Sequence, residues 1–171
     1  MPELRIQLVK EKDGSILLRC HRADGTTTWQ RNDGSRGSFF VVHDLTHYAV
    51  ETLLGHRRGF WGLVADGWNV TDFGAPWPRG PIPADMDPSE LIVGFLDGER
   101  AGGVKWTAAE FSDKAEKYFA SHDQPKSINL SDAELDAIRA LRGELVARWS
   151  LLPRGETLEL AFDRAAFALM S

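Results

Sequence analysis

The sequence has one cysteine, no long apolar run and no excess of basic residues, and each scarcity excludes a class of protein. Cys20 has no second cysteine to pair with, so an intrachain disulfide cannot form. No apolar stretch approaches the roughly 18 residues that a membrane-spanning helix needs. The net charge of −5 offers no positive surface to nucleic acid or anionic lipid. We therefore expect no nucleic-acid or membrane partner and a cytoplasmic location.

The chain does contain enough apolar side chains to build a core. Its 171 residues are 43% hydrophobic, which suits one globular domain spanning residues 1–171. No repeat, linker or low-complexity segment divides the chain. We therefore expect a single domain with its own hydrophobic core.

Asp-Gly pairs punctuate the first 35 residues at nearly regular spacing. They are Asp13-Gly14, Asp24-Gly25 and Asp33-Gly34. An Asp-Gly pair between segments of alternating polar and apolar residues is a strong hairpin signal, because both residues tolerate the positive φ of a tight turn. Residues 4–31 are therefore predicted to form a three-stranded antiparallel meander. The alternation in residues 158–162 predicts a fourth strand that returns to the same sheet.

The spacing of apolar residues then changes to that of a helix. Ser38 is positioned to cap a helix over residues 39–54, and Gly55 follows where a left-handed C-cap belongs. At about 100° per residue, one side of this helix carries an apolar stripe. We expect its members to be buried; they are Val42, Leu45, Ala49 and Leu53.

Three further helices are indicated by a cap residue followed three positions later by Glu. The pairs are Asp87 and Glu90, Thr107 and Glu110, and Ser131 and Glu134. In this arrangement each side chain can satisfy the free backbone N–H of the other. The predicted fold class is α+β: a mostly antiparallel sheet of about four strands, packed on one side by four or five helices.

The stretch HDLTHYAVE, residues 43–51, carries the clearest chemistry. His43 and His47 stand four apart on the predicted helix, so their rings can reach one metal ion. His-Asp-x-x-His resembles the His-Glu-x-x-His motif of zincin metallopeptidases, over five residues of the chain. The resemblance implies that His43 and His47 bind zinc and that Asp44 is the general base. Asp is one methylene shorter than the usual Glu, about 1.5 Å of reach.

Glu51 lies on the same stripe as the two histidines but too far along the helix for direct convergence. Eight residues separate it from His43, about 12 Å along the axis. Because helical side chains lean toward the N-terminus, Glu51 meets His47 first. Among the metal-site residues it is therefore expected to orient His47 rather than to bind the ion. A third ligand must come from elsewhere; by chemistry it is His21, His56, Asp66, Asp72 or Glu90.

Two other interpretations stay open. His43 and His47 can instead be a hydrogen-bonding pair without a metal, with His47 and Glu51 an ordinary pair on the helix surface. Residues 59–83, rich in aromatics, Gly and Pro, can hold a short helix near residues 61–65 and pack as an additional core. The sequence is thus consistent with a metal-dependent hydrolase, or with a non-enzymatic module that binds a small molecule or a protein through residues 59–83.

Overall fold

The computed structural model describes residues 1–169, whose sheet has the strand order β3-β2-β1-β4. All three pairings are antiparallel, and β1 (Leu4–Lys10) lies between β2 (Ile16–Arg22) and β4 (Thr157–Phe162). β3 (Thr27–Asn32) forms the other edge beside β2. Gly14 and Gly25 adopt positive φ in the two hairpin turns, as the Asp-Gly pairs predict. The meander and the returning fourth strand are confirmed.

α1 (Gly34–Leu54) is longer than the sequence pattern predicted. Its N-cap is Asp33 rather than Ser38, so the helix begins directly after β3. Gly55 has φ 64° and ends the helix in the left-handed conformation, as expected. The early start was missed because Gly34 and Gly37 are poor helix formers, and the tight link from β3 to α1 depends on tertiary packing.

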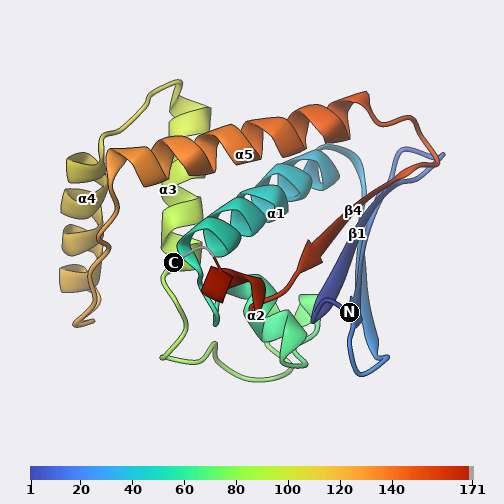
Figure 1. The fold of residues 1–171 in the computed structure, drawn as a ribbon, viewed down its shortest axis with the longest axis horizontal. Coiled ribbons are helices and arrows are strands. Elements are labelled where there is room, and N and C mark those ends of the chain that lie inside the picture. The colour runs from blue at the N-terminus through green and yellow to red at the C-terminus, as the bar shows by residue number, and fades with distance from the viewer. Residues whose placement is uncertain (170–171) are drawn as a thin grey trace.

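α1 lies between two hydrophobic clusters, which explains its burial. The first cluster joins the inner face of the sheet to α1, α2 (Phe60–Ala65) and α5 (Asp132–Leu151). The second joins α1 and α5 to α3 (Ser89–Gly102) and α4 (Ala108–Ser121). Figure 1 shows the helices on one side of the sheet, with α3 and α4 on the far side of α1 and α5. A helix enclosed in this way is buried around most of its circumference.

The predicted apolar stripe of α1 is therefore only part of its buried surface. Leu45 and Ala49 are buried, whereas Val42 and Leu53 are only half-buried. Val41 and Val50, outside the predicted stripe, are fully buried instead. A single apolar periodicity identifies one packing partner, and α1 has two.

Two of the three predicted helix starts have the expected caps. The Thr107–Glu110 and Ser131–Glu134 pairs form complete capping boxes at α4 and α5. The prediction for Asp87 is wrong, because Pro88 is the N-cap of α3 and no side chain caps it. Oδ2 of Asp87 accepts the backbone N–H of Arg58 instead. The Glu90 side chain forms no capping bond at its own helix end and contacts α1 instead.

Residues 59–83 are mostly ordered loop that contributes to the main core. The segment contains α2, which confirms the expected short helix, and the 3-10 helix η1 (Val70–Phe73). Trp61 is fully buried, and Phe60 and Phe73 pack against the first cluster. Trp77, in contrast, is 48% exposed. The additional-core interpretation holds for the first half of the segment and not for Trp77.

The described residues form a single α+β domain, as the sequence predicted. A second short 3-10 helix, η2 (Ala166–Leu169), follows β4. Within residues 1–169, no helix combines the length and the apolar character needed to cross a bilayer. The layers position α1 so that one side faces the sheet and another faces α3, and the histidines lie on the α3 side.

Candidate metal centre

The two histidines of α1 lie where α1 meets α3. His43 keeps 18% of its side-chain surface exposed, whereas His47 is only 1% exposed and Glu51 is fully buried. The interpretation of His47 and Glu51 as a surface pair is therefore wrong. The reason is that α3 and α2 cover this side of α1, which a pattern within one helix does not reveal.

α3 supplies two carboxylates, each of which contacts a different histidine. Nε2 of His47 lies 2.8 Å from Oε2 of Glu90, and Nδ1 of His43 lies 2.8 Å from Oδ2 of Asp97. Glu90 and Asp97 are two helical turns apart and therefore share one face of α3. The chain directions of α1 and α3 oppose each other along this contact, since the later histidine meets the earlier carboxylate.

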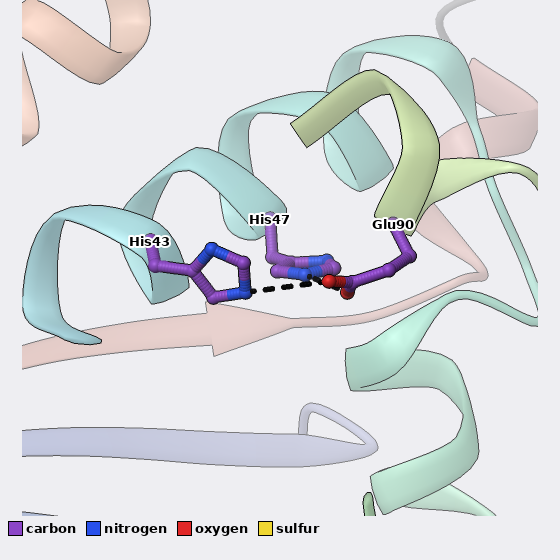
Figure 2. A group of neighbouring side chains, drawn as sticks. All are labelled: His43, His47 and Glu90. Atoms are coloured by element: carbon purple, nitrogen blue, oxygen red, sulfur yellow. Dashed lines mark hydrogen bonds and ion pairs between the residues drawn. The ribbon is translucent and has the colours of Figure 1, made fainter. Parts of the chain in front are cut away.

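Three possible ligand groups converge at this contact, as Figure 2 shows. Nε2 of His43 lies 3.8 Å from Oε1 of Glu90, and the ligand atoms of His43, His47 and Glu90 all lie within 4.8 Å of one another. Ligands of a tetrahedral zinc ion at about 2.1 Å stand roughly 3.4 Å apart. Small side-chain rotations therefore suffice to bring the three groups to one ion. Glu90, whose side chain is 63% exposed, forms the open side of the group.

Both imidazoles are held by a second carboxylate through the nitrogen that faces away from Glu90. Asp97 binds Nδ1 of His43, and Oε1 of Glu51 lies 3.1 Å from Nδ1 of His47. This arrangement fixes each ring orientation and assigns the Nδ1 proton to the carboxylate side. Nε2 of each ring then faces Glu90 and is the nitrogen that would bind a metal. Carboxylates in this position are usual behind metal-binding histidines.

Glu51 also fixes the start of α2. Its carboxylate accepts the backbone N–H groups of Phe60 at 2.7 Å and Trp61 at 2.9 Å. Gly59 allows this approach, because a Cβ there would lie only 2.6 Å from Oε2 of Glu51. The geometry agrees with the expectation that Glu51 meets His47 first, and it adds a connection to α2 that the sequence did not suggest.

The ionisation of His47 is governed by these neighbours. Burial alone would lower the pKa of His47, but the hydrogen bonds and charges of Glu51 and Glu90 outweigh it and raise the pKa to about 10. Burial raises the pKa of Glu51, whereas its three hydrogen-bond donors favour the ionised carboxylate. Without a metal, His47 is therefore protonated at neutral pH and donates from both nitrogens. A metal at Nε2 takes the place of one proton.

Asp44 lies beside the histidines and is 8% exposed. Its carboxyl group accepts no hydrogen bond from any residue in 1–169. Burial raises the pKa of Asp44 to about 7; the charges of His43 and His47 oppose this shift, and those of Glu90 and Asp97 add to it. Asp44 thus belongs electrostatically to the same group, and its charge also contributes to the raised pKa of the Cys20 thiol.

The other third-ligand candidates have separate roles. His21, on the uncovered face of the sheet, bonds Gln7, and His56 bonds the hydroxyl of Ser89. Asp66 forms an ion pair with Arg164, and Asp72 closes the capping box of η1. Among the described residues, only Glu90 completes a group of three with His43 and His47.

The sequence indicates Glu90 only as one of five candidates and does not point to Asp97. The informative signal was the spacing of seven between these two acids on one predicted helix. That spacing places both carboxylates on one face, ready to meet a histidine pair on a neighbouring helix. The signal was obscured because Glu90 also fits the helix-cap pattern.

Two imidazoles and one carboxylate are a donor set with defined chemistry. It holds zinc in several hydrolases and leaves a fourth position for water, and it also suits non-haem iron.

Comparisons with protein-family models, with curated proteins and with solved structures give no match. The chemistry of the site therefore rests on its own geometry.

Proposed function

We propose that the protein binds one divalent transition-metal ion through His43, His47 and Glu90, with zinc as the expected ion, and acts as a metal-dependent hydrolase. One observation carries the proposal: both imidazoles present Nε2 toward Glu90 while a carboxylate holds Nδ1. A histidine pair that served packing alone would not need both rings fixed in this way. The exposure of Glu90 supports the proposal further, because it leaves room for water and substrate.

Asp44 is the proposed general base. A carboxylate whose pKa is near the working pH can both take a proton from water and release it again. The pKa of Asp44, about 7, and its lack of a hydrogen-bond partner among residues 1–169 support this role. A zinc ion at the site would lower the pKa of a water molecule bound to it. Asp97 and Glu51 would keep the two imidazoles in place throughout.

Metal content tests this proposal. Protein purified without added metal and analysed for its elements should contain close to one equivalent of zinc, and iron in its place would assign oxidative chemistry instead. Zinc added to the stripped protein should bind one equivalent tightly at pH 7.5 and much more weakly at pH 5.5, because protons compete for the imidazoles. His43→Ala, His47→Ala and Glu90→Ala should each abolish the tight equivalent. The exposed Glu90 provides the variant least disruptive to folding.

His21→Ala is the matched control, since His21 lies on the uncovered face of the sheet. It should bind zinc as the wild type does. Unchanged affinity in Glu90→Ala, or no binding by the wild type at micromolar zinc, would contradict the proposal.

The second candidate function is a non-enzymatic module that binds a small molecule or a protein through residues 59–83. The supporting observation is an open apolar hollow beside the exposed Trp77, lined also by Gly80, Pro81 and Ile82. Protein that contains no metal and takes up none would shift the preference to this function. Binding should then change the fluorescence of Trp77, and Trp77→Ala should remove that change.

A cytoplasmic location is also proposed. The single Cys20 is fully buried in the core, and burial raises the pKa of its thiol. Such a thiol is unreactive and requires no oxidising compartment.

A further inference from the structure

The charge around His43, His47 and Glu90 is strongly negative, and this restricts what can bind there. Four carboxylates gather around the two imidazoles: Asp44, Glu51, Glu90 and Asp97. Within the described part of the chain, each ion pair of Glu51, Glu90 and Asp97 is with a histidine, and none is with Lys or Arg. A divalent ion would balance only two of these four carboxylates when all of them are ionised.

Sites that act on anions are built differently. Enzymes that bind phosphoryl or carboxylate groups surround them with Arg, Lys or a second metal ion. Like charges in neighbouring groups repel appreciably at the effective dielectric of a protein site. An anionic ligand that approaches the metal would meet Asp44 and Asp97; the guanidinium of Arg142 interacts with Asp97 at longer range but forms no ion pair with it.

An aromatic ring lies at the exposed end of the histidine pair. Phe39 stacks on His43 with ring centroids 5.7 Å apart and an angle of 23°, and it is 46% exposed. On the opposite side, Phe60 lies 5.3 Å from the ring of His47. The row of four rings places apolar surface next to the ligand position, and an exposed aromatic face also attracts a cation.

We propose that this metal site takes an uncharged or positively charged ligand whose apolar part rests on Phe39, and that it disfavours carboxylates and phosphates. The inference rests on the proposed function, because it concerns the ligand of the same metal. It names the substrate class: a neutral or cationic amide or ester with an apolar group, in preference to a phosphate ester.

Cobalt(II) provides a probe, since its visible absorption changes when a ligand joins the metal. Cobalt-loaded protein at pH 8 is titrated with imidazole, 4-phenylimidazole, acetate and inorganic phosphate. Imidazole is expected to bind, and acetate and phosphate are expected to bind at least about tenfold more weakly in the wild type than in Asp44→Asn. The affinity for imidazole should change less than threefold in the same variant. Because the affinity of the same ligand is compared between the wild type and the variant, its intrinsic strength as a cobalt ligand cancels.

The role of Phe39 is tested with the pair of imidazoles. The wild type should bind 4-phenylimidazole more tightly than imidazole. Phe39→Ala should lower the ratio of these two affinities by about three- to tenfold. Trp77→Ala, which alters an exposed aromatic side chain of another segment, should leave the ratio unchanged. Equal losses in both variants would overturn the assignment of Phe39.

The two proposals fail in different ways. If one equivalent of cobalt gives no ligand-sensitive band, the metal site itself is wrong and this inference falls with it. If the band appears, but acetate and phosphate bind as tightly in the wild type as in Asp44→Asn, only the inference on ligand charge is overturned.

Discussion

Oε1 of Glu51 lies 3.1 Å from Nδ1 of His47, and the same carboxylate receives the first two backbone N–H groups of α2. One buried side chain thereby connects a proposed metal ligand to the start of a neighbouring helix. The orientation of His47 therefore depends on a segment that supplies no ligand.

Loss of the carboxylates that hold Nδ1 of the two histidines should weaken metal binding without abolishing it. Glu51→Gln and Asp97→Asn should each reduce zinc affinity by about 10–100-fold, because the imidazoles lose their orientation and part of their basicity. Competition with a chromophoric chelator measures the change. Asp113→Asn, at an exposed pair on α4, is the control and should have no effect. Wild-type affinity in both Glu51→Gln and Asp97→Asn would show that these contacts do not serve a metal.

A methyl group at position 59 should lower zinc affinity by displacing the carboxylate of Glu51. Gly59→Ala would place a carbon 2.6 Å from Oε2 of Glu51, so the carboxylate must move away from His47. Zinc affinity should fall by about the same factor as in Glu51→Gln. Gly94→Ala is the matched control: it lies on α3 between Glu90 and Asp97, and its Cβ would meet nothing within 4 Å. Equal affinities in the two alanine variants would contradict the connection.

The core of α1 should matter more for folding than the partly exposed His43 does. Leu45 is 1% exposed within the first cluster, so Leu45→Ala should cost about 2–5 kcal/mol of unfolding free energy. His43→Ala should cost clearly less in metal-free protein, since His43 is partly exposed. Urea denaturation in the presence of a chelator compares the two. A larger loss for the histidine variant would make His43 a structural residue.

The raised pKa values of Asp44 and His47 should make the stability of the metal-free protein depend on pH. The pKa of Asp44 rises from 3.8 to about 7 on folding, so its contribution to stability is present below pH 3.8 and is lost as pH rises through 7. The pKa of His47 rises from 6.5 to about 10, so its contribution is complete below pH 6.5 and is lost as pH rises through 10. Both groups therefore make the metal-free protein less stable toward alkaline pH.

The variant Asp44→Asn isolates one of these two contributions. Relative to the wild type, it should gain stability between pH 5 and pH 8.5, because the asparagine never becomes a buried charge. Urea midpoints of metal-free protein across this range provide the measurement. A difference between the two proteins that stays constant with pH would mean that Asp44 is already ionised at pH 5.

The sheet could be predicted because its signals are local. Asp13-Gly14 and Asp24-Gly25 specify turns by their own backbone preferences, and each strand alternates between the core and solvent. The fourth strand was recognisable for the same reason. The apolar periodicity of α1 predicts a helix but not its first turns, since Gly34 and Gly37 give no helical signal.

The complete site could not be predicted because it depends on how distant segments pack. The spacing of His43 and His47 is a property of one helix, whereas Glu90 lies 43 residues beyond His47 and Asp97 lies 54 beyond His43. Only the opposed packing of α1 and α3 brings them together. The burial of His47 likewise follows from a second core that the periodicity of α1 does not specify.

The central claim is that His43, His47 and Glu90 bind one metal ion, and anomalous diffraction from crystals grown with zinc tests it most directly. We expect a single strong peak at the zinc absorption edge, about 2.0–2.2 Å from Nε2 of His43, Nε2 of His47 and a carboxylate oxygen of Glu90. Absence of a peak at that position in zinc-containing crystals, with His47 still bonded to Glu51 and Glu90, would contradict it.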